Sequence, residues 1–332
     1  MIKLVDSQTE VGSIREILEE SKPLVDEYGR RINYLRLSLT QRCNHSCFFC
    51  HREGEADSGA EMTGEEIARL VRLVSKLGIT RVKLTGGEPL LREDIIDIVK
   101  SLSPMVEDLS LTTNGSLLEE KALDLKKAGL NRINVSLHTL NNETHGKVTG
   151  SNDLDIVKRG IEKSIEVSLT PIKINMTMLK GLNEQEITSM INFAGEIGAT
   201  LQLIELQEIA DIPGTQSNFW VDLDPIEEYL RKVAVKVEQR TLHGRRIYTV
   251  LTNDGKITIE VVRPMHNPSF CGQCTRLRVT SDGKLKPCLL RNDNLVSTRS
   301  DRDETDSEGK LLTALMKAVK VREPFWKEEG QA

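Results

Sequence analysis

The chain has 332 residues, of which 38% are hydrophobic and 29% charged, a composition typical of soluble globular proteins. Its net charge of −5 argues against general nucleic-acid binding, which favours a basic surface. No stretch approaches the roughly 20 apolar residues that a membrane-spanning helix needs, and the N-terminal segment does not resemble a secretory signal. We therefore expect a cytoplasmic protein without nucleic-acid or membrane partners, with room for one large domain and a smaller one.

Residues 33–206 alternate between short strand-like runs and segments with helical spacing. The predicted strands are 33–39, 81–86, 108–114, 132–137, 171–179 and 200–206, and the predicted helices between them are 64–78, 92–102, 118–129, 154–166 and 184–198. Apolar residues in the helical segments recur at i, i+3, i+4 and i+7. This alternation predicts a parallel α/β sheet, either doubly wound or closed as a TIM-like barrel. In both cases the chemistry belongs at the C-terminal ends of the strands.

The alternation stops near residue 208. Residues 209–222 contain Pro, Gly and Ser with little periodicity, which indicates a linker. A helix at 224–233, strands at 245–252 and 256–262, a hairpin turn at SDGK (281–284) and a helix at 310–319 are expected to follow. The predicted organisation is an N-terminal extension (1–25), a main unit (26–208), the linker, and a smaller α+β domain with the tail (223–332).

The six cysteines fall into two triplets with none left over: Cys43, Cys47, Cys50 and Cys271, Cys274, Cys288. In a reducing compartment cysteines are usually metal ligands or catalysts. The run CFFCH matches the attachment pattern of a c-type haem, but that interpretation leaves Cys43 without a role and belongs to exported proteins. Two readings stay open at this point. One is zinc, completed by His45 or His51 at the first triplet and by His266 at the second. The other is a pair of [4Fe–4S] clusters, each with three thiolates and one open iron.

The segment TGGEP (85–89) follows the second predicted strand. Two glycines there allow close approach of the backbone to a ligand, and Glu88 is expected to add a carboxylate that faces the same cavity. C-x3-C-x2-C after the first strand, GGEP after the second and Phe49 before the last cysteine together resemble the radical S-adenosylmethionine (SAM) superfamily. The resemblance implies a partial (β/α)6 TIM-like barrel. It also implies a [4Fe–4S] cluster on Cys43, Cys47 and Cys50 that binds SAM at its open iron and yields a hydrogen-abstracting 5′-deoxyadenosyl radical.

The second triplet lies in FCGQCTRLRVTSDGKLKPCL, a C-x2-C-x13-C pattern. Together with DEYGRRINYLRLSLTQRC, it closely resembles the MoaA-type GTP 3′,8-cyclase family over about residues 26–290. The resemblance implies a second [4Fe–4S] cluster whose open iron binds the guanine of GTP. It also implies that the radical takes the hydrogen from C3′, which then bonds to C8, in the first committed step of molybdenum cofactor biosynthesis. It further implies an electron donor protein, which the sequence does not identify, and a downstream cyclic pyranopterin monophosphate synthase. A homodimer is compatible with it.

The resemblance also assigns roles to individual residues. The implied SAM contacts are Phe49, Gly87, Glu88, Ser136 and Gln207, and the implied GTP contacts are Arg36, Lys83, Thr112, Lys173, Arg276, Leu277 and Arg278. Arg36 and Lys173 lie in otherwise apolar strands, where a charge without a partner is costly. Arg276 and Arg278 alternate on a predicted strand, so both side chains can point to one face.

Two positions depart from the family pattern. Gln207 stands where the family often has Met, and the chain ends Glu329-Gly330-Gln331-Ala332 where bacterial members end in Gly-Gly. The second departure favours an archaeal-like branch. Two alternative functions remain, namely a different two-cluster radical SAM enzyme acting on a substrate such as a peptide, and a zinc-stabilised, non-enzymatic binding module. The binding module would leave TGGEP and the strand cations unexplained.

Overall fold

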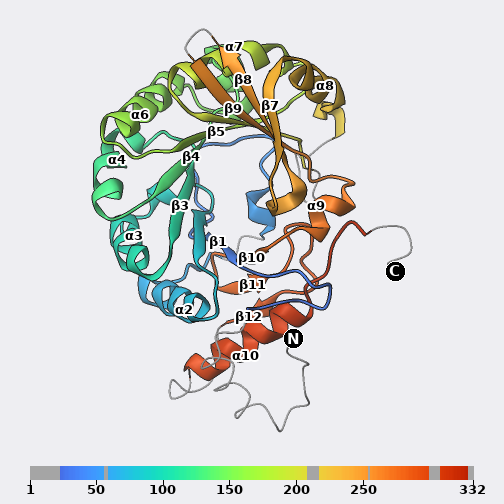
Figure 1. Ribbon diagram of the computed structural model, residues 1–332. Coiled ribbons are helices and arrows are strands. Elements are labelled where there is room, and N and C mark those ends of the chain that lie inside the picture. The colour runs from blue at the N-terminus through green and yellow to red at the C-terminus, as the bar shows by residue number, and fades with distance from the viewer. Residues whose placement is uncertain (1–22, 56–58, 208–216, 253–254, 299–306, 328–332) are drawn as a thin grey trace.

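The computed structural model describes residues 23–55, 59–207, 217–252, 255–298 and 307–327. Six parallel strands form the centre of the sheet: β1 (Tyr34–Ser38), β2 (Arg81–Thr85), β3 (Asp108–Thr113), β4 (Arg132–Ser136), β5 (Ile172–Thr177) and β6 (Thr200–Ile204). They curve into an incomplete ring with helices on the outside (Figure 1). The predicted partial barrel is confirmed, and most strand ends lie within two residues of their predicted positions.

Helix α5 (Asn142–Thr149) lies apart from the main core, because its Val148 packs in a separate small cluster with Leu179 and Leu206. The outer helices are α2 (Gly64–Lys76), α3 (Ile95–Leu102), α4 (Leu118–Lys127), α6 (Leu154–Glu166) and α7 (Ile187–Glu196). The apolar residues of the strands turn toward them, as Leu35 and Leu37 of β1 do, and join one buried core. Burying each leucine contributes about 1.5–3 kcal/mol. Thr63 and Glu66 form a reciprocal capping box that starts α2. Among the described residues, no helix is long and apolar enough to cross a membrane.

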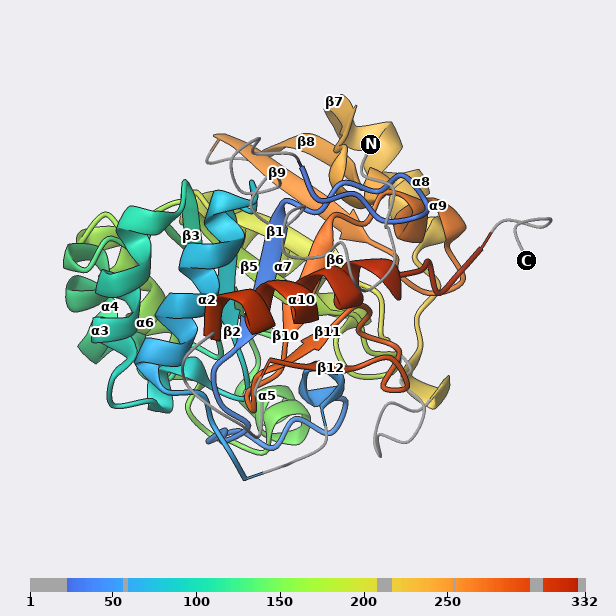
Figure 2. The ribbon, with the colours of Figure 1, turned by 90° about the horizontal axis from the view of Figure 1, so that it is seen from below.

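The C-terminal part adds α8 (Asp224–Val233), β7 (Ala234–Gln239), β8 (Arg246–Thr252), β9 (Gly255–Val262), α9 (Pro268–Gly272), β10 (Arg276–Val279), β11 (Lys284–Lys286), β12 (Val296–Ser297) and α10 (Ser307–Lys320). Its strands extend the sheet at both edges, in the order β12-β11-β10-β1-β2-β3-β4-β5-β6-β9-β8-β7. Both β9 and β10 pair in parallel with their barrel neighbours, β6 and β1. Helix α10 lies along β11, β12 and α2 (Figure 2).

The predicted units 26–208 and 223–332 therefore share one sheet, and the boundaries between them stay a prediction. Most of the predicted extension (1–22), residue 208 with most of the linker (209–216), and the last residues of the tail (328–332) lie outside the described residues. The SDGK turn does join β10 to β11 as an antiparallel hairpin. Helix α5 and strand β7 were not predicted.

Candidate active site

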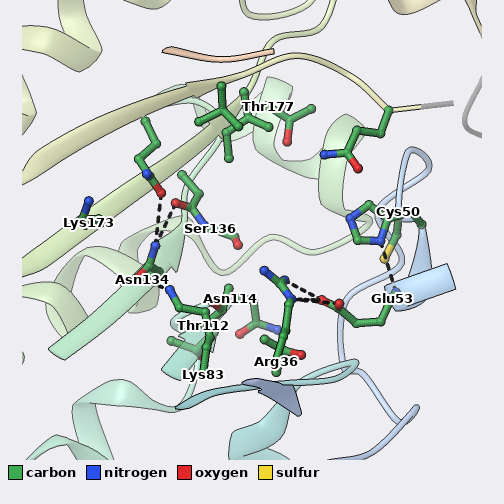
Figure 3. Close-up of a pocket in the computed structure, with 18 of the residues that line it drawn as sticks. Arg36, Cys50, Glu53, Lys83, Thr112, Asn114, Asn134, Ser136, Lys173 and Thr177 are labelled. Carbon is green, nitrogen blue, oxygen red and sulfur yellow. Dashed lines mark hydrogen bonds and ion pairs between the residues drawn. The ribbon is translucent and has the colours of Figure 1, made fainter. Parts of the chain in front are cut away.

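A cavity of about 530 Å³ lies inside the ring of strands (Figure 3). Twelve of the predicted site residues line it: Arg36, Cys43, Cys47, Phe49, Cys50, Lys83, Gly87, Thr112, Ser136, Lys173, Gln207 and Arg276. Six others do not line it: Glu88, Cys271, Cys274, Leu277, Arg278 and Cys288. Leu277 is fully buried in the core, so only its backbone could reach a ligand.

The GGEP segment packs directly on the first cysteine loop. The Gly87 N–H donates to the Thr40 carbonyl (2.7 Å), and the Glu88 N–H donates to the Arg42 carbonyl (2.8 Å). A Cβ on Gly87 would lie 2.2 Å from the Arg42 oxygen, closer than any real contact. The two glycines are thus required by the backbone that carries the cysteines.

Glu88 does not face the cavity as the sequence suggested. Its carboxylate is fully buried and accepts hydrogen bonds from Thr113 Oγ1 (2.9 Å), the Asn114 N–H (2.7 Å) and the Leu90 N–H (2.9 Å). Burial raises the pKa of Glu88 to about 7. The residue therefore ties the end of β2 to the end of β3, and the loops that border the cavity depend on it.

The Asp153 carboxylate links two histidines and so anchors the first cysteine loop to a neighbouring segment. Asp153 accepts from His45 Nε2 (2.8 Å) and from His145 Nε2 (3.0 Å), and both histidines are buried. In the same region the Ser46 N–H donates to the Thr149 carbonyl (2.7 Å). His45 is thereby used to anchor the loop to α5.

The donor sets of both triplets suit iron–sulfur clusters better than zinc. Within the described part of the chain, the only three His, Cys, Asp or Glu ligand atoms within 4.8 Å of one another belong to His45, His145 and Asp153. A tetrahedral zinc ion holds sulfur ligands about 3.8 Å apart, whereas a [4Fe–4S] cluster takes each cysteine on a separate iron. All six cysteines are free. Burial raises the pKa of Cys47 to about 12, so its thiolate form needs a bound cation.

In the second triplet, Cys271 lies in α9, Cys274 lies two residues after the end of α9, and Cys288 lies two residues after the end of β11. Two buried arginines support its first turn. Arg30 donates to the Cys271 carbonyl (3.0 Å), Arg322 donates to the Cys274 carbonyl, and Asp26 is ion-paired with both arginines. Burial disfavours the Cys274 thiolate, but Arg322, Arg276 and Arg30 outweigh burial and lower the pKa of the Cys274 thiol.

Cations from three adjacent strands lie side by side on the inner face of the barrel. In β1 Arg36 is in register with Lys83 of β2 and with Arg278 of β10. Burial and the neighbouring cations lower the pKa of Lys83 well below its usual value, and Arg36 and Arg278 would repel each other without a counter-charge. Glu53 supplies one, since its buried carboxylate is ion-paired with Arg36 (2.5 Å) and with Arg278 (2.9 Å).

A second polar group lies farther around the ring. Lys83 Nζ donates to Asn134 Oδ1 (2.7 Å), as Figure 3 shows. Lys173 is ion-paired with the fully buried Glu260. Burial lowers the pKa of Lys173 to about 8, against the opposing effect of Glu260. Basic side chains thus gather on one side of the cavity, where the buried carboxylates of Glu53 and Glu260 fix their positions. This arrangement suits a polyanionic ligand.

Sequence reasoning missed the partners of the predicted cations and of the cysteine loops. They are Asp26, Arg30, His45, Glu53, Asn134, His145, Asp153, Glu260 and Arg322, of which His45 was considered only as a zinc ligand. Asn134 could have been predicted, because alternation along its strand places its side chain on the inner face, in register with Lys173 of the next strand. The carboxylates gave no signal, because the pairs Arg36–Glu53 and Lys173–Glu260 are 17 and 87 residues apart.

Two family models match this chain. The radical SAM superfamily model matches residues 37–194, and the model described as Molybdenum Cofactor Synthesis C matches residues 199–328. The chain is 50% identical over 307 residues to a "Probable GTP 3′,8-cyclase" of Thermococcus kodakarensis, covering 92% of this chain and 100% of the relative. A protein of the same description from Pyrococcus horikoshii is 49% identical over 306 residues, covering 91% of this chain and 98% of the relative.

Solved structures show the same fold at low identity. Streptococcus suis SuiB bound to S-adenosylmethionine has a TM-score of 0.61 and 15% identity, covering 94% of this chain and 76% of SuiB. The anSMEcpe structure with bound AdoMet has a TM-score of 0.52 and 17% identity, covering 87% of this chain and 84% of that one. With the full-length sequence matches, these findings show that the chain belongs to the GTP 3′,8-cyclase family of radical SAM enzymes.

Proposed function

We propose that this protein is a GTP 3′,8-cyclase that acts in molybdenum cofactor biosynthesis. Membership of the family means that the chain works with SAM and two [4Fe–4S] clusters. The observation that carries the proposal for GTP is the pairing of β10 with β1. It brings Arg276, two residues after Cys274, into the same cavity as the first cysteine triplet.

The residues have separate tasks in this proposal. Cys43, Cys47 and Cys50 hold the first cluster, and the second triplet holds the other. When bound beside the first triplet, SAM would supply the radical chemistry that removes the hydrogen atom from C3′ of GTP. Phe49, which packs edge-on against His138 with ring centroids 4.9 Å apart, forms an apolar wall beside the first triplet.

The remaining residues would bind and orient the two small molecules, and all of them except Arg278 line the cavity. Lys83, Lys173, Arg276 and the Arg36–Arg278 pair would hold the triphosphate, because guanidinium and ammonium groups in a partly desolvated cavity bind phosphate strongly. Thr112 would add a neutral hydrogen bond. Ser136, Gln207 and the Gly87 backbone would contact SAM. Holding both reactants in fixed positions is the main contribution that the protein makes to such chemistry.

The proposal also places the protein in a pathway and a compartment. Six free thiols require reducing conditions, which favours the cytoplasm. An electron donor protein would reduce the first cluster, and cyclic pyranopterin monophosphate synthase would take the product.

Anaerobic reconstitution separates this function from its alternatives. Iron and zinc are counted, and SAM, reductant and GTP are then supplied. We expect about eight irons per chain and formation of 3′,8-cyclo-7,8-dihydroguanosine triphosphate. Two zinc ions without iron would identify a zinc-stabilised binding module. Iron with SAM cleavage that yields no GTP-derived product would indicate a radical SAM enzyme with another substrate.

A further inference from the structure

The Glu53 carboxylate is ion-paired with Arg36 and Arg278, two of the cations that are proposed to bind the triphosphate. Glu53 lines the cavity, and its two oxygens contact Arg36 Nε (2.9 and 3.1 Å), Arg36 Nη2 (2.5 Å) and Arg278 Nη1 (2.9 Å). Figure 3 shows the Glu53 carboxylate meeting the Arg36 guanidinium inside the pocket. Carboxylate and phosphate groups each accept two parallel hydrogen bonds from the same edges of a guanidinium. A phosphate group and Glu53 therefore compete for these two arginines.

The turn that carries Glu53 is attached to the first cysteine triplet. Glu53 belongs to the short turn η1 (Arg52–Gly54), which begins two residues after Cys50. The Arg52 N–H donates to Cys50 Sγ (3.4 Å), and the Glu53 N–H donates to His51 Nδ1 (3.1 Å). A displacement of Glu53 is thus transmitted to the backbone beside Cys50.

The same turn has an unfavourable backbone conformation. Arg52 and Glu53 have φ angles of 46° and 53°, in the left-handed region that costs about 1–2 kcal/mol for each residue with a Cβ. Contacts on either side must offset this cost. They are the two arginines on Glu53 and the Lys286 Nζ bond to the Gly54 carbonyl (2.9 Å). Removing the arginines from Glu53 would leave the turn with one of its two anchors.

We propose that Glu53 is the resident counter-anion of the nucleotide site and that the triphosphate of the substrate replaces it on Arg36 and Arg278. The replacement frees the turn 52–54 from the two arginines and changes the position of the loop that carries Cys50. Glu53 is thus a positioning residue that couples nucleotide binding to the first cysteine triplet. The inference rests on the proposed function, since it takes a nucleoside triphosphate as the ligand.

The binding test compares Glu53→Gln with the wild-type protein. GTP and inorganic tripolyphosphate are titrated calorimetrically into the reconstituted protein without oxygen. A competing carboxylate weakens binding, so Glu53→Gln should bind both probes about tenfold more tightly, within the usual range of coupling between sites. If Glu53 only supports the arginines, the variant should bind more weakly, and that result would overturn the proposal.

Glu55→Gln is the matched control. Glu55 lies two residues farther along and accepts hydrogen bonds from Gln41 Nε2 (2.6 Å) and from the Ser281 N–H (3.0 Å), with no bond to Arg36 or Arg278 among the described contacts. Its removal should leave the affinity for both probes unchanged. Equal tightening in both variants would show a general charge effect and would contradict a specific role for Glu53.

Hydrogen exchange, measured in the wild-type protein and in Glu53→Gln, tests the coupling. Adding tripolyphosphate should change the exchange rates of the amides of residues 52–54, and Glu53→Gln should not show this change. Unchanged exchange despite binding would overturn the inference while leaving the proposed function intact. Failure of the wild-type protein to bind either GTP or tripolyphosphate would instead contradict the proposed function.

Discussion

Arg276 and Arg278 differ from surface arginines because the β10–β1 pairing turns both toward the inside of the barrel. Their neighbours Leu277 and Val279 are buried in the core. Burial lowers the pKa of each arginine to about 10, yet both stay charged at neutral pH. They are therefore cations that already lost much of their hydration, and an anionic ligand gains more from them than from exposed arginines.

Replacing both Arg276 and Arg278 with Ala should lower kcat/KM for GTP about a hundredfold or more, since each charge-assisted hydrogen bond contributes about 1.5–3 kcal/mol. The iron bound by the first triplet should be unchanged. Steady-state kinetics and iron analysis measure the two effects. The exposed pair Arg69 and Arg72 on α2 is the control, and its double Ala variant should behave as wild type. Normal GTP kinetics without Arg276 and Arg278 would refute the substrate assignment.

The buried carboxyl of Glu88 should make stability depend on pH. Its pKa is raised from 4.5 to about 7, so the folded chain binds more protons than the unfolded chain between these values. Stability is therefore lost as the pH rises through this window, by about 3 kcal/mol in total. Glu88→Gln has no such group. Urea unfolding of both apo proteins between pH 4.5 and 8 should show wild type losing stability relative to the variant, and parallel pH profiles would rule out the raised pKa.

At the scale of elements, the first cysteine loop depends on its neighbours for its shape. The end of β2 supports it through Gly87, and α5 supports it through the Asp153 bridge to His45. Gly87→Ala would place a Cβ 2.2 Å from the Arg42 carbonyl oxygen and push the loop away. We expect the reconstituted variant to hold about four irons per chain, those of the second cluster.

Gly64→Ala is the control for this prediction. Its added Cβ would make only ordinary contacts at 3.7 Å, at the start of α2. This variant should keep the wild-type iron content. A full complement of iron in Gly87→Ala would show that the close packing of β2 on the cysteine loop is not needed for cluster binding.

The sequence allowed the regular elements to be predicted better than the contacts between them. Strands β1–β6 follow from β-branched and leucine-rich runs, and α6 from its helical apolar spacing, because burial on one face imposes these periods. Helix α5 was missed because its polar run contains Gly146, although Asn141 caps its start. Strand β7 was missed because almost all its residues are exposed, so no face imposes a pattern.

The site shows the same limit at longer range. The alternation of side chains along the strands and the family motifs led to the prediction of Arg36, Lys83 and Lys173 as site residues. The carboxylates opposite them could not be found, because an ion pair across the barrel depends on how the chain folds back and leaves no local pattern. Glu88 was expected in the cavity for the same reason, since its partners Thr113 and Asn114 lie at the end of the next strand and just after it.

At the scale of the whole molecule, one sheet joins the two family regions. Strand β10 completes one edge of the barrel and β9 the other, so neither region buries its edge strands alone. Leu277, fully buried in β10 beside Leu35 of β1, lies at this junction. The barrel and the second triplet should therefore unfold together.

Leu277→Ala should cost about 2–5 kcal/mol, as other buried leucines do. Circular dichroism and tryptophan fluorescence of the apo protein in urea should shift to lower concentration together, since the chain has two tryptophans, Trp220 and Trp326, in its C-terminal part. Leu123→Ala, at a position 42% exposed on α4, should have little effect. Separate transitions for the two probes would contradict a shared sheet as the unit of stability.

The most direct measurement uses GTP with deuterium at C3′, supplied with SAM and reductant to the reconstituted enzyme. A GTP 3′,8-cyclase should transfer that deuterium to 5′-deoxyadenosine, as mass spectrometry would detect. Formation of 5′-deoxyadenosine without deuterium, in a protein that holds both clusters and binds GTP, would contradict the proposed function.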